Sequence, residues 1–163
     1  MDLGICHYRL NNLRTARERY QWAFEESERL EWTEGIAGAL LNLGLVDRVE
    51  AQWEMAERHL LRAKKSFAEL GLMRGYTLAV LNLGLQRLWK GSLAVAEEDL
   101  TVAARLAAEI GDNQVESTAR MDRGLALVRM GRMEEARQEL ARAIRLCRQQ
   151  SSPRRLAIAL EYL

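Results

Sequence analysis

The chain has 163 residues, of which 48% are hydrophobic and 29% are charged, and its formal net charge is +1. This composition excludes a disordered polymer, and the balance of charges argues against a protein whose main role is to hold nucleic acid. The longest uncharged runs, residues 35–46 and 75–86, are too short to cross a bilayer as helices, which takes about 20 apolar residues. A single proline beside abundant Ala, Leu, Glu and Arg predicts an all-α chain.

Apolar periodicity and helix breakers predict nine helices. Gly71 and Gly111 suit left-handed helix C-termini. Asp112 and Ser152 suit N-caps, with Pro153 at a first helical position. In chain order, the expected helices cover residues 1–10, 13–31, 33–50, 53–70, 73–90, 93–110, 113–130, 133–149 and 153–163.

An internal repeat of 40 residues organises these helices. The segment 39–45 returns at 79–85 with six of seven residues identical. One glycine recurs in each unit, and an alanine follows it twelve residues later: Gly4, Gly44, Gly84 and Gly124, then Ala16, Ala56, Ala96 and Ala136. A glycine inside a helix costs about 1 kcal/mol relative to alanine, so we interpret these small residues as a close approach of two antiparallel helices. The expected units are 1–32, 33–72, 73–112, 113–152 and a partial unit 153–163 of one repeat array.

This pattern resembles the tetratricopeptide repeat (TPR) family over essentially the whole chain. The family signature is seen at Leu83-Gly84, Gly91, Ala96, Leu100 and Ala103. The resemblance implies a right-handed α-solenoid, a superhelix of antiparallel helix pairs with about four and a half repeats. The 40-residue length exceeds the usual 34, and the Asn-Leu-Gly motif is similar to that of MalT-like bacterial regulators and Pins/LGN-type adaptors.

Three residues depart from the repeat pattern. Ala51 stands where a turn glycine is usual, and Arg123 and Gln150 stand at positions that are apolar in the sister repeats.

The resemblance also implies a concave groove, lined by the first helix of each unit, that binds a peptide or helix of a partner protein. Spacings of 3 and 4 place each set of groove positions on one helical stripe. Asn42 and Asn82 suit the backbone of an extended peptide, or alternatively bond neighbouring helices or water. Trp89 either stacks on a partner or belongs to the core. With only two arginines in the groove, a clamp for a C-terminal carboxylate is disfavoured. The expected groove residues are Asp2, Ile5, Arg9, Asn42, Leu45, Val49, Asn82, Leu85, Trp89, Asp122, Leu125 and Arg129.

The sequence contains no phosphate-binding loop, nucleophile–base arrangement or metal-ligand spacing. We therefore expect no enzyme activity, no metal and no cofactor. Cys6 and Cys147 are expected to be reduced thiols, and His7 and His59 to be partly buried or solvated side chains. The absence of a signal peptide in the first residues predicts a cytoplasmic location.

Charge is uneven along the chain. Residues 25–34 hold five glutamates against one arginine, a net charge of −4, and residues 129–155 hold eight arginines against three glutamates, a net charge of +5. The plain interpretation is a solvated outer surface. The alternatives are docking to an acidic partner, head-to-tail docking between copies, or nucleic-acid binding, which lacks aromatic stacking residues here.

The sequence favours a protein-interaction scaffold within a larger signalling or regulatory protein. The first alternative is an effector-sensing module of a MalT-like transcriptional regulator, and the second is a self-association module. The chain begins and ends inside a repeat unit, so we expect an excerpt of a longer protein whose apolar end residues Leu156, Ile158 and Leu160 support homo-oligomers.

Overall fold

The computed structural model describes residues 12–149. Within this range it contains seven helices and no strand. Each helix begins at the residue that the periodicity predicts and ends within two residues of the predicted end. The helices are α2 (Leu13–Arg29), α3 (Thr33–Val49), α4 (Trp53–Glu69), α5 (Met73–Lys90), α6 (Leu93–Glu109), α7 (Asn113–Arg129) and α8 (Met133–Gln149).

The expected fold of nine helices in four and a half repeats is therefore corrected. The described range holds seven helices, which make one single helix, α2, followed by three pairs. The predicted helices at 1–10 and 153–163 lie outside the described residues, as do Ser152 and Pro153.

The turns between helices repeat every 20 residues, and each contains one residue with a positive φ angle. This residue is glycine in four turns, at Gly71, Gly91, Gly111 and Gly131, whereas Glu31 and Ala51 adopt it in the first two. At Ala51 the amide donates to the Arg48 carbonyl, and the following amide donates to the Asp47 carbonyl. This pair of hydrogen bonds is the Schellman arrangement, which satisfies the last carbonyls of a helix and stops it.

Two of the helix starts are capped by side chains. The Asp112 carboxylate accepts a hydrogen bond from the Val115 amide, as the sequence predicts for this N-cap. The Asn12 side chain accepts from the Thr15 amide at the start of α2. Each bond satisfies one of the amides that a helix N-terminus leaves unpaired.

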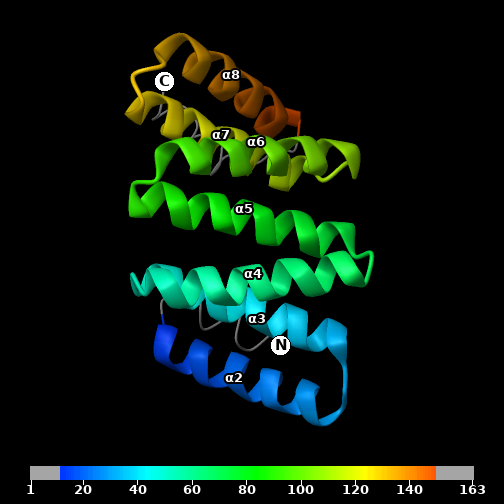
Figure 1. Cartoon of the computed structure of the whole chain (residues 1–163). Coiled ribbons are helices and arrows are strands. Elements are labelled where there is room, and N and C mark those ends of the chain that lie inside the picture. Colours follow the sequence, from blue (N-terminus) through cyan, green and yellow to red (C-terminus); the bar gives the residue numbers. More distant parts are fainter. Residues whose placement is uncertain (1–11, 150–163) are drawn as a thin grey trace. The chain divides into compact units, whose positions relative to one another are not determined.

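The chain divides into two compact units with a boundary inside α5, after Ala79. In the first unit, α3 packs against both α2 and α4 (Figure 1). Its core forms around Leu40 and Phe67, with Ala37, Ala63 and Ala79, and a second cluster joins Ala16, Tyr20, Leu43 and Val46.

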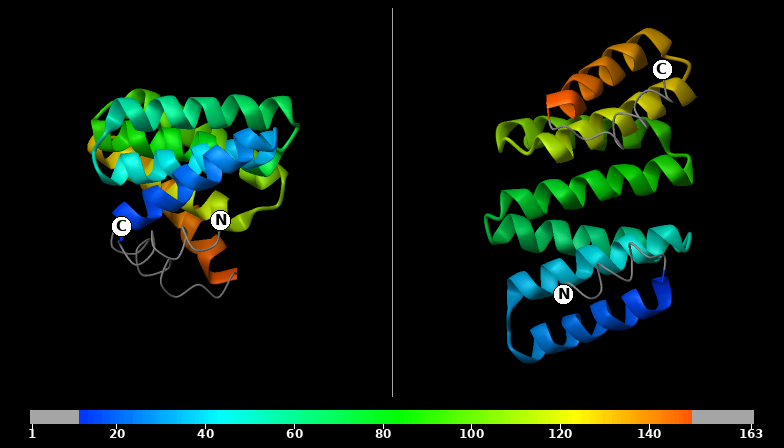
Figure 2. Two further views of the ribbon diagram at one scale, coloured as in Figure 1. Left: turned by 90° about the horizontal axis from the view of Figure 1, so that it is seen from below. Right: turned by 180° about the vertical axis from the view of Figure 1, so that it is seen from behind.

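In the second unit, α7 packs against both α6 and α8, and Figure 2 shows these neighbours from behind. One apolar cluster joins Leu88, Ala96 and Ala126, and another joins Met121, Ala143, Ile144 and Cys147. Cys147 is a buried free thiol, and Cys6 lies outside the described residues.

The repeated glycines allow a leucine of the next helix to lie directly on the helix backbone. A Cβ atom at Gly44 would come within 2.7 Å of Leu60 Cγ, and one at Gly124 within 2.8 Å of Leu140 Cγ. Ala56, Ala96 and Ala136 begin the facing stretch of the second helix and are buried. The small residues therefore set the separation within a helix pair.

None of the helices in residues 12–149 has the length and apolar character needed to span a membrane.

Candidate functional site

The predicted groove residues of the first unit lie on α3. Asn42 and Leu45 are half-buried there, and Val49 is 44% exposed. The earliest predicted positions, Asp2, Gly4, Ile5 and Arg9, lie outside the described residues.

In the second unit the predicted residues lie on α5 and α7. Asn82 is buried, with 8% of its surface exposed, so its surroundings differ from those of Asn42 in the preceding repeat. Leu85 and Asp122 are half-buried, and Leu125 packs against the cluster of Leu88, Ala96 and Ala126.

The structure brings two of the predicted groove residues, Trp89 and Arg129, into contact. Arg129 Cζ lies 5.2 Å from the centroid of the Trp89 ring, which is a cation–π contact. Arg129 Nη1 also donates to the carbonyl oxygen of Leu88 at 3.2 Å, near the C-terminal end of α5, where carbonyls lack helical partners. The arginine thus joins α7 to the end of α5 and holds the indole in place.

Trp89 nevertheless stays 51% exposed. An indole with one face against a guanidinium and much of its surface open presents a large, rigid, partly apolar contact area. Tryptophan and arginine are the residues most enriched among those that dominate protein–protein binding energy.

A second feature of this unit is an ion-pair network that crosses α6, α7 and α8. Arg120 Nε donates to Glu116 at 2.8 Å, and its Nη1 donates to Glu139 at 2.8 Å. Arg123 pairs with Glu97 at 2.6 Å and with Glu139 at 3.1 Å. Arg142 reaches the same Glu139 at 3.2 Å. Three arginines and three glutamates take part, so the network is neutral.

Of the six residues in this network, only Arg123 was predicted from the sequence to depart from the repeat pattern. The repeat register contains the signal for two others, because Glu116 aligns with Ile36 and Tyr76, and Arg120 aligns with Leu40 and Val80. The last full repeat therefore carries charges on a face of the first helix where its sisters carry apolar side chains.

Arg120 pairs with two carboxylates of the network, Glu116 and Glu139. Burial lowers the pKa of its guanidinium, but the hydrogen bonds to Glu116 and Glu139 outweigh burial, so the pKa lies above its ordinary value. Arg120 is thus held as a charged and fixed group.

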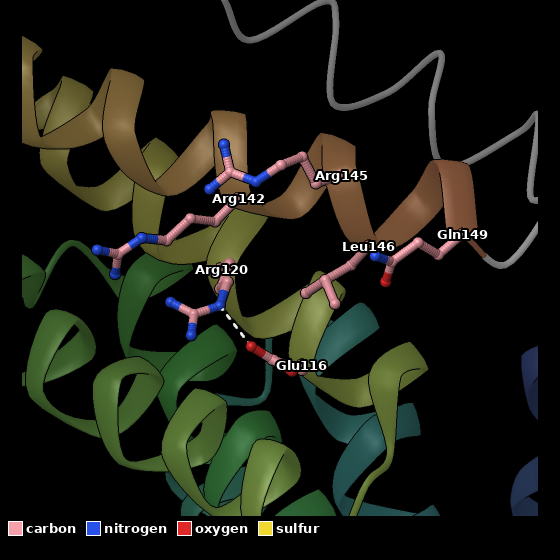
Figure 3. A pocket seen from close by; sticks show the side chains of 6 residues that line it. All are labelled: Glu116, Arg120, Arg142, Arg145, Leu146 and Gln149. Carbon is pink, nitrogen blue, oxygen red and sulfur yellow. Dashed lines mark hydrogen bonds and ion pairs between the residues drawn. The ribbon is translucent and has the colours of Figure 1, made fainter.

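A pocket of about 270 Å³ opens beside this network, between α7 and α8. In Figure 3, Glu116 and Arg120 project from α7, joined by their ion pair, and the other lining side chains project from α8. The α8 residues that line it are Arg142, Arg145, Leu146 and Gln149.

The first unit carries a different pocket, about 360 Å³, at the end of α2. Trp22, Leu30 and Trp32 line it and are 60%, 60% and 52% exposed. Ala23, Glu26 and Ser27 complete the lining. Gly35 leaves room for the Trp32 ring, because a Cβ atom there would collide with it.

His59 contacts a buried carboxylate of the first unit. Its Nδ1 lies 2.6 Å from Asp47, whose side chain is fully buried and also 2.8 Å from Arg17. Across residues 12–149, no three His, Cys, Asp or Glu side chains are grouped closely enough to hold a metal ion.

No protein-family model and no curated protein matches the sequence significantly. The fold has clear matches among solved structures. One is a Rap protein complexed with competence and sporulation factor, with a TM-score of 0.85 and 16% sequence identity. The match covers 95% of this chain and 44% of that chain, so this chain spans less than half the length of the Rap protein. The fold is a TPR-like helical repeat.

Proposed function

We propose that this chain is a non-catalytic protein-interaction module whose second unit binds a peptide or helix of a partner over Trp89 and Arg129. The carrying observation is the contact between these two side chains, 5.2 Å from guanidinium carbon to ring centroid, with the indole still 51% exposed. Such an anchor has its shape before binding, so little side-chain entropy is lost when a partner covers it.

The neighbouring residues suit an amphipathic or extended partner. Leu85 precedes Trp89 by one helical turn and Leu125 precedes Arg129 by one turn, so the two half-buried leucines extend the anchor along α5 and α7. An apolar side chain of the partner then packs on leucine and indole, while Asp122, one helical turn before Leu125, adds a carboxylate to the rim.

The fold comparison supports binding in general terms. The Rap protein of similar fold is complexed with competence and sporulation factor. We propose further that this chain belongs to a larger signalling or regulatory protein and that it works in the cytoplasm. The MalT-like and Pins/LGN-type assignments and a role in transcription stay predictions.

The experiment is a selection of random peptides against the whole chain, followed by affinity measurements on two variants. Trp89→Ala removes the anchor, and Trp32→Ala is the matched control, because the exposures of these tryptophans are 51% and 52%. Loss of a binding hot spot costs about 2 kcal/mol or more, which is about 30-fold in affinity. Equal affinities for the two variants would refute the proposed anchor.

Self-association is a second candidate, favoured by the pocket of Trp22, Leu30 and Trp32. Large exposed apolar side chains around one pocket mark an interaction surface. Exposed carboxylates lie in the same stretch of the chain as the pocket residues, at Glu25, Glu28, Glu31 and Glu34. Exposed arginines lie along α8, at Arg137, Arg142, Arg145 and Arg148. This complementarity favours α8 of a second copy as the occupant.

Light scattering tests this second candidate. A concentration-dependent increase in mass that Trp32→Ser abolishes and Trp89→Ser preserves would support it. A monomer at all concentrations would exclude it and leave the partner-binding proposal untouched.

A further inference from the structure

The charges around the α7–α8 pocket do not cancel. The ion-pair network is neutral, with Glu97, Glu116 and Glu139 against Arg120, Arg123 and Arg142. Arg145 lines the same pocket but is not part of the network. Within residues 12–149 its guanidinium has no ion-pair or hydrogen-bond partner. Among the residues that the structure describes, the pocket thus carries one positive charge that no carboxylate pairs with.

Stability alone does not account for charges at this place. Taking charged groups out of water is expensive, and apolar side chains of similar volume are often as good or better for stability. The preceding repeat holds such side chains, since Tyr76 and Val80 occupy the positions that correspond to Glu116 and Arg120 of α7. The network instead fixes Arg120 and Arg142 beside the pocket without the need for a ligand.

We propose that this pocket binds a small molecule through a carboxylate or phosphate group, with Arg145 and Arg142 as its cationic ligands. A guanidinium presents five N–H donors in a planar fork that matches the oxygens of either group. One nitrogen of Arg142, Nη1, donates to Glu139 at 3.2 Å. The side-chain amide of Gln149 is a neutral donor at the rim of the pocket.

The size of the pocket fits such a ligand. A volume of about 270 Å³ exceeds the roughly 30 Å³ share of one liquid water several-fold. It therefore has room for an anionic head and a short carbon body, for which Leu146 offers an apolar contact. The site lies on the opposite side of α7 from Asp122 and Arg129, since residues 116, 120 and 123 fall on the other helical face. It is therefore separate from the Trp89 anchor.

Isothermal titration calorimetry on the whole chain tests the proposal, with inorganic phosphate and succinate as the two probes at constant ionic strength. Saturable binding of at least one probe is expected, and the stronger one identifies the chemical group. Arg145→Gln should weaken that binding about tenfold or more, because hydrogen bonds to charged groups are the stronger ones. Arg137→Gln is the control, because it removes the same charge from α8 at a residue that does not line the pocket. It should change the affinity for the anion less than about twofold.

Two results would overturn the proposal: no saturable binding of either anion, or equal weakening by both variants, which would mean general attraction to a basic helix. Far-ultraviolet circular dichroism checks that both variants keep the helical content of the parent chain.

Discussion

Leu100 lies directly on the backbone of Gly84, so closely that a Cβ atom at residue 84 would come within 2.9 Å of Leu100 Cγ. The same relationship joins Gly44 to Leu60 and Gly124 to Leu140. In each pair a leucine of the second helix fills the space that a side chain on the first helix would need.

Replacing Gly84 by leucine should therefore destabilise the fold. Overpacking of this kind costs about 1–3 kcal/mol, because neighbours must leave their rotamers or the helices must separate. Urea denaturation measures the loss. Ala94→Leu, an exposed position on α6, is the control and should change stability little. An unchanged midpoint for Gly84→Leu would contradict the packing described for this pair.

Ala51 offers the opposite test, because it adopts φ +57 in a turn position that glycine occupies four times elsewhere. The left-handed conformation costs about 1–2 kcal/mol for an L-residue, and glycine removes this cost. Glycine also gives the unfolded chain more freedom, which offsets about 0.4–1 kcal/mol of the gain in stability. Ala51→Gly should therefore stabilise the chain by about 0.5–1 kcal/mol. Gly111→Ala should destabilise it by a similar amount, and thermal denaturation of both variants measures the pair. The same sign of change in both would be inconsistent with this account of the turns.

The helix positions follow from sequence because the 40-residue register repeats both the apolar faces and the breakers. Asp112 caps the start of α7 with its carboxylate, and Gly111 ends α6 with a positive φ angle, as their residue types predict. The number of helices was wrong: nine were expected and the described range holds seven. The two other predicted helices, at residues 1–10 and 153–163, lie outside the described residues.

The candidate sites were harder to predict. Periodicity placed Trp89 and Arg129 on related stripes, but it does not say that one side chain stacks on the other, since that depends on rotamers. Glu116 and Arg120 were not among the predicted site residues. Comparing each with its sister positions would have shown them on a face that is otherwise apolar.

Glu139 should be the most sensitive carboxylate of the ion-pair network, because it accepts from Arg120, Arg123 and Arg142 and is only 4% exposed. Removing one member of a fully buried pair costs roughly 3–5 kcal/mol. Since the arginines here are partly exposed, we expect about 2–3 kcal/mol for Glu139→Gln. Chemical denaturation should show this loss, while Glu134→Gln on the same helix leaves stability nearly unchanged because that side chain is 76% exposed. A small effect of Glu139→Gln would mean that solvent screens the network.

The surface ion pair of Arg132 and Glu135 should make the stability of the fold depend on pH. The Arg132 guanidinium donates to both carboxylate oxygens of Glu135 at 2.6 Å, and this hydrogen bonding holds the pKa of Glu135 below its ordinary value. Because the folded pKa is the lower one, the contribution to stability is present above the unfolded pKa and is lost as the pH falls through the folded pKa. The chemical shift of the Glu135 carboxyl carbon, followed by NMR as the pH is changed, measures this pKa. Arg132→Gln should raise the pKa of Glu135, and Arg137→Gln should leave it unchanged. If the pKa of Glu135 stays the same in Arg132→Gln, the hydrogen bonds from Arg132 are not what lowers it.

Indole N–H signals in proton–nitrogen NMR spectra report directly whether a partner binds over Trp89. A peptide from the selection is titrated into labelled protein, and the four tryptophan signals are assigned by single Trp→Phe variants. The Trp89 signal should shift in proportion to the bound fraction, while the Trp32 signal should stay in place. A peptide that reaches saturation with the Trp89 signal unmoved would contradict binding over Trp89.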